Sequence, residues 1–103
     1  LAAARGLGDA YKRQTVQDIA DYIGINRSYL TSIFKKQLHV SPKEYLMRFK
    51  LNIAAKQLTD TSMSIQEIAT GIGYDNPLTF SKIFKQEYGI SPRHYREEKK
   101  ISI

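Results

Sequence analysis

The chain has 103 residues, with 16 Lys and Arg against 10 Asp and Glu, so its formal net charge is +6. Hydrophobic residues make up 42% of the sequence, which is typical of a globular domain and excludes a disordered tail. The absence of cysteine excludes disulfides and thiolate zinc sites, and it suits a cytoplasmic protein. No apolar run is long enough to cross a bilayer, so no membrane role is expected. Because the sequence begins with Leu1 rather than Met, we expect a fragment of a longer polypeptide.

An internal repeat organises the sequence. The segment VQDIADYIG at 16–24 returns as IQEIATGIG at 65–73. Further along, the second copy again matches the first, with Ser41, Pro42 and Tyr45 returning as Ser91, Pro92 and Tyr95. Two copies are too few for a solenoid, so the repeat predicts a tandem pair of small helical units.

The first unit, 15–40, has the spacing of two helices joined by a turn. Thr15 followed by Asp18 marks the start of the first helix, and Gly24 accepts the left-handed backbone of a sharp turn. A second helix is predicted over about 27–37, with Asn26 as its cap. The residues of this helix that are expected to face the core are Leu30, Ile33 and Phe34.

The segment 41–60 is predicted to be a long linker helix. Ser41 and Pro42 are typical of a helix start, and helical spacing continues to Thr59. Apolar residues follow two lines on different sides, one through Leu46 and one through Leu51, so the helix should be buried from two directions. Its length would be roughly 27 Å, which can be compared with the spacing of about 34 Å between successive major grooves on one side of DNA.

The second unit, 61–98, repeats this pattern and adds a closing helix after Ser91. Ser64 and Glu67 form a capping box, Gly73 marks the turn, and a second helix is predicted over 77–88. The residues of that helix that are expected to face inward are Phe80, Ile83 and Phe84. Residues 99–103 are predicted to form a short tail.

Together these patterns predict an all-α fold with two helix-turn-helix units. A single such pair would be equally compatible with two helices of any small bundle, but two matched pairs in a basic chain favour nucleic-acid binding. Arg27 and Lys82 are the expected guanine readers, because their donors match guanine acceptors in the major groove. The side chains expected to contact phosphate are Lys35, Lys36, Lys85 and Arg96. Any one of these cations could simply be solvated, so the prediction of DNA contact depends on the whole group.

The run IATGIGYDNPLTFSKIFKQEYGISPRHYR at 68–96 resembles the defining motif of the AraC/XylS family of bacterial transcription regulators, and the resemblance covers about 15–98. It implies about seven helices, in which two helix-turn-helix units joined by a long helix bind successive major grooves of double-stranded DNA. It also implies recruitment of RNA polymerase at a promoter or operator. The positions that match the family's base contacts are Arg27, Ser28, Thr31 and Ser32 in the first unit and Pro77, Leu78, Ser81 and Lys82 in the second.

Some positions depart from the family pattern. Ser32 stands where many relatives carry Arg, Pro77 and Leu78 replace common polar readers, and Lys50 stands where the linker often has Arg. Residues 1–14 match poorly, because Gly6 and Gly8 interrupt the first helix that the family would have there. Family members usually add an effector-binding or dimerisation domain, and a related group carries a receiver domain as response regulators.

The sequence gives less support to two other classes of function, an enzyme and a protein-interaction module. An enzyme would have to use His39 or His94, and neither has a second ligand or a carboxylate at metal-ligand spacing, so no catalytic residue, metal or cofactor is expected. A helical protein-interaction module would use exposed aromatic residues. The aromatic residues that mostly lie at core spacing, and are therefore expected to pack inside, are Tyr22, Tyr29, Tyr45, Phe49, Phe80, Phe84, Tyr88 and Tyr95. The prediction is a sequence-specific DNA-binding domain of a transcription regulator that is expected to be an activator, with a response-regulator output domain as the alternative.

Overall fold

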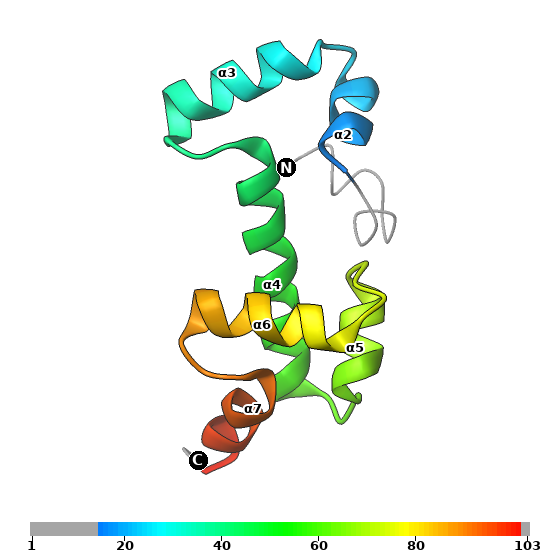
Figure 1. Ribbon diagram of the computed structural model, residues 1–103, viewed down its shortest axis with the longest axis vertical. Helices are drawn as coiled ribbons and strands as arrows, with labels where there is room; N and C mark the ends of the chain where they lie inside the picture. The colour runs from blue at the N-terminus through cyan, green and yellow to red at the C-terminus, as the bar shows by residue number, and fades with distance from the viewer. Residues whose placement is uncertain (1–14, 102–103) are drawn as a thin grey trace. The chain divides into compact units, whose positions relative to one another are not determined.

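The computed structural model describes residues 15–101, in which every regular element is an α-helix (Figure 1). The helices are α2 (Val16–Ile23), α3 (Arg27–Leu38), α4 (Pro42–Asp60), α5 (Ile65–Gly71), α6 (Pro77–Tyr88) and α7 (Pro92–Ile101). This confirms the predicted all-α fold. The helix considered within 1–14 lies outside the described residues. The chain divides into two compact units between Phe49 and Lys50, a point inside α4. We call them the N-terminal and C-terminal units.

Matching capping boxes begin the first helix of each helix-turn-helix. The Thr15 hydroxyl accepts from the backbone N–H of Asp18 at 3.2 Å, and the Asp18 carboxylate accepts from the Thr15 N–H at 3.0 Å. Ser64 and Glu67 make the same two bonds, both at 3.0 Å. Each box satisfies two N–H groups that have no partner within the helix. Both predicted helix starts are therefore confirmed.

The turns between paired helices have the predicted backbone. Gly24 and Gly73 adopt positive φ values of 83° and 98°. The alanine in the middle of the preceding helix is fully buried in each copy, with Ala20 and Ala69 both 0% exposed. A small residue at this position lets the second helix approach closely, so the turn and the packing repeat together.

The core of the N-terminal unit is small. Val16, Ala20 and Leu30 are buried, and Phe34 packs against them from α3 while meeting the Tyr45 ring of α4 edge-on at 5.8 Å. The prediction that Ile33 faces this core is wrong, because its side chain is 37% exposed. Leu30 and Phe34 lie on one line of α3, four residues apart, whereas Ile33 is rotated about 100° from Phe34.

Two aromatic residues of the same unit are also more exposed than expected. Tyr22 is 56% exposed and Tyr29 is 59% exposed, so the interpretation of both as core residues is wrong. The buried cluster of this unit consists of Val16, Ala20 and Leu30, and the hydrophobic residues packed against it are Ile19, Ile25 and Phe34 rather than either tyrosine.

The C-terminal unit has a larger, aromatic core. Its side chains with less than 2% exposure are Leu51, Leu58, Ile68, Ile72, Phe80, Phe84 and Pro92. The Phe84 ring stacks on Tyr88 with a centroid distance of 4.4 Å and meets Tyr95 edge-on at 5.4 Å. Burial raises the pKa of Tyr88, with the charges of Tyr95 and Glu87 adding to the effect, and burial likewise raises the pKa of Tyr74.

Helix α4 is continuous over 19 residues, close to the predicted 42–59. Its buried apolar residues are Leu46 on one predicted line, Leu51, Ala54 and Leu58 on the other, and Ala55, which lies on neither. Leu46 belongs to the N-terminal unit and the other four belong to the C-terminal unit. One helix thus contributes to two cores, as its double apolar pattern predicts.

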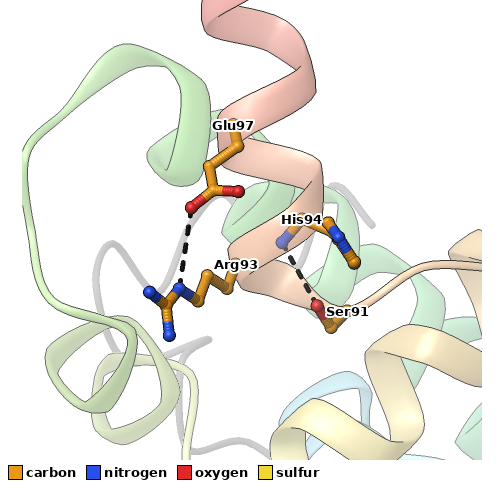
Figure 2. Close-up of polar contacts among 4 residues, drawn as sticks. All are labelled: Ser91, Arg93, His94 and Glu97. Carbon is orange, nitrogen blue, oxygen red and sulfur yellow. Dashed lines mark hydrogen bonds and ion pairs between the residues drawn. The ribbon is translucent and has the colours of Figure 1, made fainter.

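Helix α7 closes the C-terminal unit and begins at a serine cap. It continues to Ile101, so the prediction of a tail from residue 99 is wrong. The Ser91 hydroxyl accepts from the backbone N–H of His94 at 3.1 Å, and Arg93 pairs with Glu97 at 3.6 Å (Figure 2). The ion pair is exposed, so it contributes little to stability. Ser41 caps α4 in the same way, accepting from the Glu44 N–H at 3.1 Å. The repeat therefore extends to the starts of α4 and α7.

Candidate nucleic-acid interface

Helix α3 begins with exposed polar residues held by one cap. The Asn26 side-chain oxygen accepts from the backbone N–H of Ser28 at 2.7 Å and of Tyr29 at 3.4 Å. Arg27 and Ser28, two of the predicted base contacts, are exposed in the first turn that this cap organises. The first turn of a recognition helix is the part that meets base edges in helix-turn-helix proteins.

The two hydroxyl groups in the next turn of α3 both donate hydrogen bonds within the helix. Thr31 donates to the Arg27 carbonyl at 3.0 Å, and Ser32 donates to the Ser28 carbonyl at 3.1 Å. Each hydroxyl proton is thereby used inside the helix, while the oxygen lone pairs remain available. Both side chains can therefore accept hydrogen bonds from outside, as from the amino group of adenine or cytosine.

Lys35 and Lys36 are exposed in the last turn of α3. Cations there also interact favourably with the negative end of the helix dipole, so their position has a structural explanation as well. On α6, Lys82 and Lys85 are exposed, and Lys85 likewise lies in the last turn. The predicted phosphate contacts of the two helices thus include one matched pair, Lys35 and Lys85.

Helix α6 begins in the same manner as α3 but with different chemistry. The Asn76 side chain accepts from the Leu78 N–H at 2.9 Å, and Pro77 occupies the first helical position. Leu78 is 77% exposed, whereas Ser28, its counterpart in α3, is polar. Ser81 is half-buried one turn later. The reading end of α6 therefore presents an apolar side chain beside a hydroxyl and a cation.

Arg96 is directed toward the protein rather than toward solvent. Its Nε donates to the Leu58 carbonyl at 2.9 Å, and its Nη2 donates to the carbonyls of Met63 at 2.6 Å and Thr61 at 3.3 Å. Leu58 lies in the last turn of α4, where carbonyls lack partners within the helix. These bonds use donors that a phosphate contact would need, so we leave Arg96 out of the proposed DNA-binding set. The repeat itself indicates an inward position for Arg96, because its counterpart in the first copy is the buried Leu46.

One candidate was missed by the sequence analysis. Tyr29 lies in the first turn of α3 and is exposed, so its hydroxyl is available to a phosphate or a base edge. Its counterpart in α6 is Thr79, which is also exposed. Comparing the two copies could have identified Tyr29, since an exposed polar residue in one copy argues against a core position in the other.

Residues 15–101 have the features of neither a metal site nor a membrane-spanning helix. No group of three or more His, Asp or Glu side chains is arranged there to hold a metal ion. Among the same residues, no helix is both long and apolar enough to span a membrane.

Comparisons with known proteins agree with this geometry. A helix-turn-helix domain family model matches residues 19–98. The lactose operon transcription activator of Staphylococcus xylosus is 42% identical over 91 residues, which are 88% of this chain and 33% of that protein. The raffinose operon transcriptional regulatory protein of Pediococcus pentosaceus is 39% identical over 81% of this chain and 30% of its own length. The chain therefore spans about a third of the curated relatives it matches.

Two solved structures share the fold. A transcriptional regulator from Chromobacterium violaceum, described as containing an AraC-type DNA-binding domain, has a TM-score of 0.83 and 32% identity, covering 96% of this chain and 90% of that one. The C-terminal domain of AraT, a response regulator from Geobacillus stearothermophilus, has a TM-score of 0.83 and 29% identity, covering 94% and 82%.

Proposed function

This chain belongs to the AraC family of helix-turn-helix transcription regulators, and we propose that it binds specific double-stranded DNA through α3 and α6. In this proposal each helix enters a major groove, and the two grooves are successive ones. The observation that carries the proposal is the repeated start of the two helices, where Asn26 and Asn76 cap first turns that display exposed side chains. Because the two recognition helices have the same geometry but different side chains, they are suited to two adjacent half-sites of different sequence.

The proposed base contacts are the predicted set without change. They are Arg27, Ser28, Thr31 and Ser32 on α3 and Pro77, Leu78, Ser81 and Lys82 on α6. Lys35, Lys36 and Lys85 are the proposed phosphate contacts, to which we add Tyr29. Phosphate contacts supply affinity without sequence information, and base contacts supply the preference. The formal charge of +6 supports this division, since it favours attraction to any duplex before a site is recognised.

The wider role of the protein is also a proposal. The two relatives named above regulate sugar operons, and one is called an activator. We propose that this chain is the DNA-binding part of a cytoplasmic bacterial regulator that activates an operon by recruiting RNA polymerase. A further domain for effector binding or dimerisation would belong to the full protein, because the relatives are about three times as long as the match.

A second regulatory input is supported by a specific observation. The C-terminal domain of AraT, a response regulator, shares this fold, which supports a receiver domain as the alternative neighbour of this chain. In that case phosphorylation of a receiver, rather than binding of a metabolite, would control the same DNA contacts. The two inputs predict different domains beside this one and the same behaviour of α3 and α6 on DNA.

The test of specific binding is a ratio of affinities. A preferred duplex is selected from a random library with the 103-residue chain, and its dissociation constant is compared with that of scrambled duplex at physiological salt. We expect a ratio of about a thousandfold or more. Equal affinities for the two duplexes would overturn the proposal and leave only attraction between opposite charges.

Lys82→Ala separates base reading from phosphate contact. If Lys82 reads a guanine, the variant loses about 1 to 3 kcal/mol on the preferred duplex and becomes tolerant at one base pair. The matched control is Lys85→Ala, three residues along the same helix, which should weaken binding to all sequences alike. A uniform loss for Lys82→Ala would assign Lys82 to phosphate.

A further inference from the structure

Leu78 is the most exposed of the large hydrophobic side chains among the described residues, at 77%. Other residues of α6 make the contact with the core, since Phe80 and Phe84 are 0% exposed. The Asn76 cap holds the backbone of Leu78 in the first helical turn. Leu78 therefore has a fixed position on the helix and makes no contribution to the core.

An isolated exposed leucine is common on protein surfaces and indicates nothing by itself. The surroundings of Leu78 make it informative. Ser81 and Lys82 follow at three and four residues, so all three side chains lie on one face of α6. This is also the reading end of the helix, where the first helix-turn-helix presents Ser28 instead.

The major groove offers one apolar group, the C5-methyl of thymine, and every other distinguishing group there is a hydrogen-bond donor or acceptor. A leucine against any other base would leave such groups without partners, at a cost in affinity. We propose that Leu78 contacts a thymine methyl group and so makes thymine the preferred base at one position of the site. The inference rests on the proposed function, since it assumes that α6 enters the major groove.

The spacing of Leu78 and Lys82 also predicts where that thymine lies. Four helical residues correspond to a rise of about 6 Å, and successive base pairs are about 3.4 Å apart. The two side chains can therefore reach positions one or two base pairs apart. We expect the thymine within two base pairs of the guanine whose preference Lys82→Ala relaxes.

The test removes a single methyl group from the DNA. Each thymine of the selected duplex is replaced in turn by deoxyuridine, which differs only in lacking the C5-methyl, and binding of the 103-residue chain is measured. One replacement near the Lys82-dependent guanine should weaken binding about fourfold, the effect of one buried methyl group. Leu78→Ala should bind the thymine and uracil duplexes equally, and Leu78→Met should restore the difference.

Each of the other outcomes has a distinct meaning. If no thymine is selected near that guanine, or if no uracil replacement weakens binding, the inference is overturned while specific binding stands. If Leu78→Ala still distinguishes thymine from uracil, another side chain makes the contact and the inference is wrong. Failure to select any preferred duplex would instead overturn the proposed function. Circular dichroism of Leu78→Ala should match the parent, because this exposed side chain supports no packing.

Discussion

Nη2 of Arg96 donates to the Met63 carbonyl oxygen at 2.6 Å, joining α7 to the segment that follows α4. With the bonds to Leu58 and Thr61, one guanidinium donates to one carbonyl in the last turn of α4 and to two in the segment that follows it. The side chain is partly buried, so water cannot readily replace it. Arg96 therefore holds the C-terminal unit together rather than extending toward a ligand.

Replacing Arg96 should reduce stability and leave the electrostatics of DNA binding largely unchanged. Arg96→Leu, which introduces the residue found at the repeat counterpart Leu46, leaves three carbonyls without this donor. We expect a loss of about 1 to 3 kcal/mol in unfolding free energy, measured by urea denaturation. The salt dependence of DNA binding should keep its slope.

Lys85→Ala is the matched variant that tests the electrostatic contribution to DNA binding. Removing one phosphate contact should lower the slope of log affinity against log salt by about one, with little change in stability. If Arg96→Leu changed the salt slope and Lys85→Ala did not, the roles given to these two residues would be reversed.

The two repeat-related phenylalanines should differ in their contribution to stability. Phe84 is 0% exposed and stacks on Tyr88, whereas Phe34 is only half-buried. We expect Phe84→Ala to lose roughly 3 to 5 kcal/mol and Phe34→Ala to lose clearly less. Thermal unfolding of both variants measures this, and equal losses would contradict the difference between the two cores.

Two glycines should respond to alanine in opposite directions. Gly89 has a φ of 83° and Gly71 lies in α5, and in both cases an added Cβ would meet nothing within 4 Å. Only backbone conformation therefore distinguishes them. Gly89→Ala should destabilise by about 1 to 2 kcal/mol, and Gly71→Ala should stabilise by about 0.4 to 1 kcal/mol. Melting temperatures that shifted in the same direction would refute this explanation.

Glu67 should make stability depend on pH in the acid range. Hydrogen bonds from the backbone N–H and the side chain of Ser64 hold the pKa of the Glu67 carboxyl below its usual 4.5. A carboxyl whose pKa is lower in the folded state stabilises fully above its unfolded pKa and loses that contribution as pH falls through the folded value. Melting temperature should therefore fall below about pH 4.5, and Glu67→Gln should show a flatter dependence. Parallel curves for the two proteins would exclude this role.

The elements could be predicted because their signals are local. Capping at Thr15 and Ser64 and the glycine turns depend on residues a few positions apart, and all were found where expected. The second helix of the C-terminal unit matches its predicted bounds, 77–88, because Asn76 and Pro77 mark its start and Gly89 marks its end.

The burial of individual side chains was harder to predict. Helical spacing alone could not separate Phe34 from Ile33, because which line of α3 faces inward depends on how much core the neighbouring helices fill. Arg96 shows the same limit for the site, since a cation on a helix looks available until carbonyls 33 to 38 residues away are brought beside it. Contacts at that sequence separation leave no periodic pattern.

In the proposed function, α3 and α6 bind two neighbouring major grooves of one duplex. Hydroxyl-radical footprinting of the 103-residue chain on its selected duplex tests this most directly. We predict two protected segments with centres about 10 base pairs apart, one helical turn of DNA. A single protected segment, or two whose spacing does not match a turn, would contradict the account.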